Sequence, residues 1–210
     1  ELEKNALRAL FKVYLDMFAH TNIKMKIFVR DDIWKRITAD GFREASHIVN
    51  KTTIIWDRDG LLNLIMRRIL NNNSILKQLS INKSDVVADI KKQTEIFYRL
   101  VPEKVDTGKN PQTFDWIVTR ISDGQKISTP RDMIGFFQEL ITAQIKRIEQ
   151  GIEAPEGERL FDRAIFKQAL AVVSNTKYLQ TLSAEYPEYK AYFEALRGKK
   201  AEHNIETLSV

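Results

Sequence analysis

The 210-residue chain contains no cysteine, and this absence excludes a disulfide scaffold, a thiolate metal site and a cysteine nucleophile. Its only histidines, His20, His47 and His203, lie too far apart to show a metal-ligand spacing. No apolar run approaches the ~20 residues needed to span a membrane, and the first residues show no secretory signal pattern. We therefore expect a cytoplasmic protein without a membrane segment, a metal site or disulfides.

The short motifs that mark common catalytic sites are also absent. The sequence has no G-x-x-x-x-G-K-[ST] phosphate loop, no G-x-G-x-x-G, no H-E-x-x-H and no G-x-S-x-G. Residues 124–126 (GQK) have the wrong spacing for a phosphate loop. We therefore predict no catalytic residue in this chain.

The composition that remains is typical of a globular protein. Hydrophobic residues make up 43% of the chain and charged residues 29%, which is sufficient for a packed core. The net charge of +5 is distributed unevenly, with +4 over residues 1–70, +2 over residues 71–150 and −1 over residues 151–210. Because phosphate contacts dominate nucleic-acid affinity, this distribution argues against a nucleic-acid interface in the last third.

Apolar residues at three- and four-residue spacing predict a mostly helical chain. The best-marked helix starts at Thr129-Pro130-Arg131-Asp132, where threonine caps, proline occupies the first turn and an acid lies near the positive end. Its expected apolar face comprises Met133, Ile134, Phe137, Leu140, Ile141, Ile145 and Ile148. The other expected helices cover residues 2–19, 33–38, 42–49, 58–70, 84–100, 114–121, 160–173, 175–185 and 188–196.

Two segments predict strands instead. Residues 23–29 (IKMKIFV) alternate apolar and basic residues and then become wholly apolar, and residues 52–56 (TTIIW) are rich in β-branched side chains. The expected fold class is mainly α, with an α/β remnant of two or three strands, a helical lid bundle and a small winged-helix-like helical unit at the C-terminus. Because so few strands cannot form a complete sheet, we expect further strands upstream of Glu1.

Three segments in this order carry a resemblance to a known family: IKMKIFVRDDIWKRI, TTIIWDRDGLLNLIMRRI and STPRDMIGFFQELITAQ. Together they resemble the second half of bacterial P-loop ATPases, the STAND-like members of the AAA+ relatives, over about residues 5–150. Residues 158–196, with FKQAL and AEYPEYKAYFEAL, are more weakly similar to the first helices of a winged helix.

The resemblance implies a nucleotide-sensing role for three residues. Arg30, at the end of the first expected strand, would sense the γ-phosphate, Pro130 would be the lid proline near the adenine, and Arg131 would be a second sensor. ATP and Mg²⁺ would be cofactors of the parent protein. Because the Walker A and Walker B segments are absent, this chain alone is expected not to hydrolyse ATP and to bind it weakly or not at all.

The resemblance also implies a division into three parts. Residues 1–56 would be the remnant of the P-loop α/β core, residues 57–150 the helical lid, and residues 151–210 a linker followed by the winged-helix-like unit and a disordered tail. Expected partners are ATP in the parent protein, and the remaining ATPase core or a second copy of the chain.

Three functions follow from these observations. The first is the sensor and lid portion of an ATPase that acts as a nucleotide-dependent switch in bacterial defence or signalling. The second is a nucleic-acid-binding helix-turn-helix module, and the third is a helical protein-interaction domain. Without the resemblance, Arg30 is expected to pair with Asp31, Asp32 or Asp57, and Pro130 and Arg131 simply begin a helix.

Overall fold

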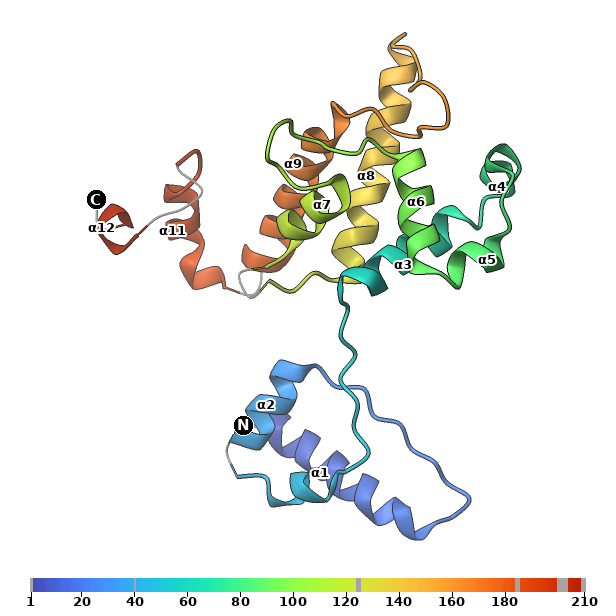
Figure 1. The fold of residues 1–210 in the computed structure, drawn as a ribbon. Coiled ribbons are helices and arrows are strands. Elements are labelled where there is room, and N and C mark those ends of the chain that lie inside the picture. Colours follow the sequence, from blue (N-terminus) through green and yellow to red (C-terminus); the bar gives the residue numbers. More distant parts are fainter. Residues whose placement is uncertain (1, 40, 124–125, 184–185, 200–203, 209–210) are drawn as a thin grey trace. The chain divides into compact units, whose positions relative to one another are not determined.

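The computed structural model describes residues 2–39, 41–123, 126–183, 186–199 and 204–208. The chain forms two compact units, Glu1–Ile55 and Trp56–Val210 (Figure 1). The described residues are mainly helical, which confirms the expected fold class, and none of them forms a β-strand.

The first unit is held together by an amphipathic helix packed on a second, shorter one. Helix α1 (Leu2–Asp16) continues as a 3₁₀ turn, η1 (Met17–Ala19), and is followed by α2 (Asp31–Ala39) and the 3₁₀ turn η2 (Arg43–His47). The small core consists of Phe11, Ile37, Phe42 and Ile48. Phe11 and Trp34 form a T-shaped pair with ring centroids 5.0 Å apart, which fixes α1 against α2.

The two predicted strands are wrong. Residues 23–29 and 52–56 are extended in part, but neither pairs with another described segment. A strand requires a neighbouring backbone about 4.8 Å away to accept and donate its hydrogen bonds, and the described part of the first unit provides none. Phe28, Ile54 and Ile55 are 84%, 69% and 80% exposed, so the β-prone side chains are left uncovered as well.

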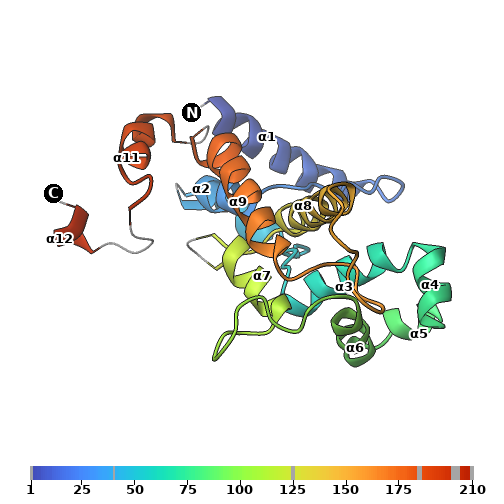
Figure 2. The ribbon, with the colours of Figure 1, turned by 90° about the horizontal axis from the view of Figure 1, so that it is seen from above.

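The second unit is a helical bundle in which α8 is the longest element. Helix α9 lies along α8 in both views, and α3 and α7 also contact α8 (Figures 1 and 2). Its elements are α3 (Arg58–Ile69), α4 (Asn73–Leu79), α5 (Lys83–Val87), α6 (Ile90–Leu100), α7 (Thr113–Ile121), α8 (Pro130–Glu149), α9 (Ile165–Lys177), the π-helical turn η3 (Tyr178–Leu182), the 3₁₀ turn η4 (Pro187–Tyr189), α11 (Lys190–Ala195) and α12 (Ile205–Leu208).

Side-chain caps set where the main helices begin. Asp57 accepts a hydrogen bond from the Gly60 N–H at 2.7 Å and starts α3, and Thr129 accepts one from the Asp132 N–H at 3.1 Å and starts α8. Both starts agree with the sequence prediction. The helix expected over residues 84–100 is divided in two, because Asp89 accepts from the Lys91 N–H at 2.8 Å and begins α6 anew.

The core of the second unit is aromatic. Trp116 of α7, Phe136 of α8 and Phe166 of α9 are at most 1% exposed, and their ring centroids lie 6.3–6.4 Å apart. These rings hold α8 and α9 together, so residues 165–177 belong to the same unit as the helices before residue 150. The expected disordered tail contains the short helix α12, and residues 200–203 and 209–210 lie outside the described residues.

Candidate functional site

Arg30 does not end a strand, contrary to its sequence-based placement, because residues 23–29 form none. It stands immediately before α2, and its guanidinium makes two hydrogen bonds to the Asp32 carboxylate, Nε–Oδ1 at 3.0 Å and Nη2–Oδ2 at 3.2 Å. This pairing with an acidic neighbour is one of the arrangements that the sequence left open. Both side chains are exposed, so the pair contributes little to stability.

Pro130 and Arg131 form the first turn of α8, as the capping pattern predicts. Arg131 is exposed, and its guanidinium forms no hydrogen bond or ion pair with a described residue. The two residues belong to the second unit and Arg30 to the first, so neither unit brings the three predicted sensor residues into one site. Their nucleotide-sensing role stays a prediction.

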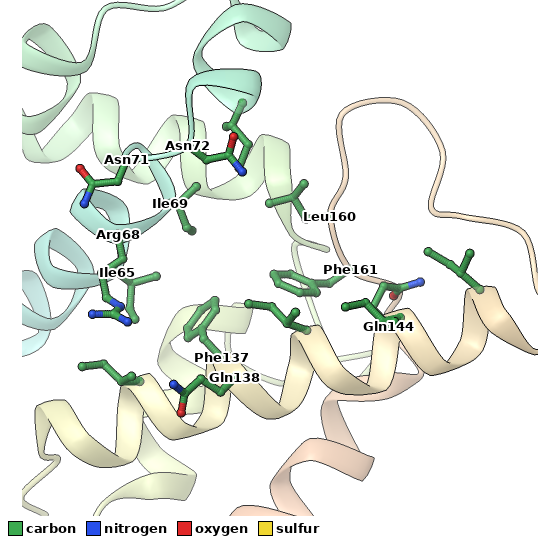
Figure 3. Close-up of a pocket in the computed structure, with 15 residues that line it drawn as sticks. Ile65, Arg68, Ile69, Asn71, Asn72, Phe137, Gln138, Gln144, Leu160 and Phe161 are labelled. Carbon is green, nitrogen blue, oxygen red and sulfur yellow. The ribbon is translucent and has the colours of Figure 1, made fainter.

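An apolar groove of about 620 Å³ lies on the second unit and was not predicted. Its walls are the end of α3, the start of α4, one side of α8 and the segment just before α9 (Figure 3). The lining side chains are Ile65, Arg68, Ile69, Asn71, Asn72, Ile75, Ile134, Phe137, Gln138, Ile141, Gln144, Ile145, Ile148, Leu160 and Phe161.

The groove exists because the apolar surface of α8 is wider than the bundle covers. Leu140 is fully buried, whereas Ile141, Ile145 and Ile148 are 48%, 50% and 47% exposed. These three isoleucines recur at helical spacing and form one stripe, which we call the isoleucine stripe. An apolar stripe that no part of the described unit covers is typical of an interaction surface.

The wall formed by Leu160 and Phe161 is fixed by hydrogen bonds to the bundle. The Arg99 guanidinium makes two bonds of 2.7 Å to Glu158, and the Leu160 N–H donates to the Leu100 carbonyl at 2.8 Å. The bidentate bond from Arg99 lowers the pKa of the Glu158 carboxyl. The groove is therefore a preformed feature of the bundle and does not depend on a loose loop.

Arg68 and Gln144 each carry a polar group in the groove that lacks a partner among the described residues. Arg68 is the only charged lining side chain, and among the described residues nothing pairs with it. Gln144 is 5% exposed and its Oε1 accepts the Asp162 N–H at 2.8 Å, but its buried Nε2 has no acceptor in the described structure. The Asp162 bond fixes the orientation of the amide, because the donor must face an oxygen. A buried unsatisfied group costs about 1–3 kcal/mol, so this one requires an explanation.

Other kinds of site are not evident in the described residues. No group of three or more histidine, aspartate or glutamate side chains among them could hold a metal ion. Among the described helices, none has both the length and the apolar character needed to cross a membrane.

The groove left a signal in the sequence. The expected apolar face of the helix that starts at Thr129 included both Leu140 and its neighbour Ile141, so the pattern marked residues of the groove without separating them from the buried ones. In the structure, Leu140 on this face is buried, and Ile141 beside it is about half exposed. Comparisons of the chain with protein-family models, curated proteins and solved structures find no match.

Proposed function

We propose that the second unit of this chain is a helical protein-interaction module whose groove binds an amphipathic helix of a partner protein. The observation that carries the proposal is the isoleucine stripe, Ile141, Ile145 and Ile148, which is about half exposed along one wall of a preformed groove. Recognition of a helix in a groove uses apolar anchors at this three- and four-residue spacing.

The dimensions of the groove support a helical partner. Its α8 wall extends from Ile134 to Ile148, which at 1.5 Å per residue is about 21 Å, or four helical turns. The opposite wall contributes Ile65, Ile69 and Ile75, which alternate with the polar side chains of Arg68, Asn71 and Asn72. A helix of about 15 residues fits this length. Its apolar face would cover the isoleucine stripe, and the burial of both apolar surfaces supplies the hydrophobic contribution to affinity.

A displayed library of random 16-residue peptides tests this function with the full chain as bait. Enriched peptides are expected to carry large apolar residues at helical spacing. The substitution Ile145→Glu is expected to abolish their binding, because it places a charge in the middle of the stripe.

The matched control is Val172→Glu. Val172 on α9 is 47% exposed, like the isoleucines, but it does not line the groove. If Ile145→Glu still enriched the same peptides, the groove would be refuted as the binding surface. The same holds if Val172→Glu abolished their enrichment as completely as Ile145→Glu.

The nucleotide-dependent switch remains a second proposal, favoured by one feature of the first unit. The backbone groups of residues 24–29 and 50–56 form no hydrogen bond with another described backbone group, although both segments are rich in strand-forming residues. Strands of a larger sheet would behave in this way when their neighbours belong to another segment. The reading frame upstream of Glu1 tests it: an encoded phosphate loop supports the switch, and a start codon directly before Glu1 would overturn it.

A further inference from the structure

We infer that the helix bound in the groove is acidic in its first turn and runs parallel to α8. This inference rests on the proposed interaction function and adds the charge and the direction of the partner. It is carried by the unpaired cations at one end of the groove and the unpaired amide at the other.

The two cations belong to different helices but to the same end of the groove. Arg68 of α3 lines it, and Figure 3 shows this side chain on the side of Gln138, near Ile65. Arg131 lies one turn before Ile134 on the same side of α8. Both arginines are exposed and no described residue pairs with either of them. No acidic side chain lines the groove, so its net charge is positive and favours an acidic partner.

Toward the other end of the groove, Gln144 presents a hydrogen-bond donor. Gln144 lies beside Phe161, away from Arg68 (Figure 3), and its Nε2 is unsatisfied. The last carbonyl groups of a helix have no partners within that helix and accept hydrogen bonds from such donors. The Gln144 Nε2 has no acceptor among the described residues, and a carbonyl of the partner's last turn would supply one.

These two requirements fix the direction of the partner helix. Acidic residues stabilise the first turn of a helix, where the macrodipole is positive, and free carbonyls lie at its last turn. The partner therefore places its first turn at Arg68 and Arg131 and its last turn at Gln144. Since α8 begins at Pro130, the partner runs in the same direction as α8.

Three designed peptides of 16 residues test the inference by fluorescence anisotropy with the full chain. All have the same leucine stripe; the first carries two glutamates in its first turn, the second carries them in its last turn, and the third carries two lysines in its first turn. We expect the first peptide to bind most tightly. With the variant Arg68→Glu/Arg131→Glu it should bind roughly two- to thirtyfold more weakly, as the loss of two exposed ion pairs predicts, while the lysine peptide gains.

Arg163→Glu is the control, because Arg163 is exposed and carries the same charge but does not line the groove. Equal affinity for all three peptides, with loss in Ile145→Glu, would overturn the inference and leave the proposed function intact. Absence of binding by every peptide, together with a library that yields no enrichment, would overturn both. Displacement of the first peptide by myristate at a lower concentration than the peptide itself would assign the groove to a fatty acid and also overturn the inference.

Discussion

Neighbouring residues on α8 provide a direct test of the groove, because Leu140 is 0% exposed and Ile141 is 48% exposed. Leu140→Ala removes a fully packed side chain and leaves a cavity, which is expected to lower the free energy of unfolding by about 2–5 kcal/mol. Ile141→Ala removes a side chain of which only half is buried. Since full burial of an isoleucine contributes about 1.5–3 kcal/mol, half of it gives roughly 1 kcal/mol, and water fills the space that is left. The higher helix propensity of alanine reduces this loss further, by a few tenths of a kcal/mol.

The assay must report on the second unit alone. The chain has three tryptophans, and Trp116 lies in the core of that unit, so Trp34→Phe and Trp56→Phe together make Trp116 fluorescence the only tryptophan signal. Urea unfolding of each alanine variant in this background gives its change in the free energy of unfolding, provided that the slope of that free energy against urea concentration is unchanged. If Ile141→Ala proved as destabilising as Leu140→Ala, the isoleucine stripe would be covered, and the groove would not be an open surface.

Three further predictions concern the frame of the unit and the nucleotide. Glu158→Gln should lower the free energy of unfolding at neutral pH. The bond from Arg99 lowers the pKa of the Glu158 carboxyl below its ordinary value of about 4.5. The stability that this bond contributes is therefore present above pH 4.5 and is lost as the pH falls through the lowered pKa. Urea midpoints from neutral to acidic pH should therefore converge between variant and parent, and parallel curves would contradict this. Asp57→Ala should cost about 1 kcal/mol through loss of the Gly60 cap, with Asp57→Asn as the conservative control that retains most of it. Calorimetric titration with Mg–ATP should show no low-micromolar binding to the chain, because the sequence lacks a phosphate loop, and micromolar affinity would refute that expectation.

Much of the helical fold could be predicted because its signals are local. Periodic apolar residues and the caps Asp57 and Thr129 lie within one or two helical turns of the structure they determine. Helix α4 shows where such signals are ambiguous. The run of asparagines before it is typical of a loop, yet Asn72 accepts a hydrogen bond from the Ser74 N–H at 2.9 Å and caps a helix.

The strands could not be predicted correctly because a strand is defined by its partner. The β-branched run of residues 52–56 records a preference of the chain for extended backbone, and no local pattern states whether a second strand lies beside it. The groove was missed for a related reason. Periodicity identifies the apolar arc of α8, but only the positions of α3 and α4 determine which part of the arc is covered.

The exposed apolar side chains of the two units have different physical requirements. Phe28, Ile54 and Ile55 belong to segments whose backbone groups are also unpaired, so side-chain contacts alone would leave N–H and C=O groups without partners. The isoleucines of α8 stand on a helix whose backbone is satisfied within itself, so they need only a complementary apolar surface. A single kind of partner does not meet both requirements. We therefore expect the extended segments of the first unit to associate with strands and the groove of the second unit to bind a helix, and a substitution in one surface should leave binding at the other unchanged.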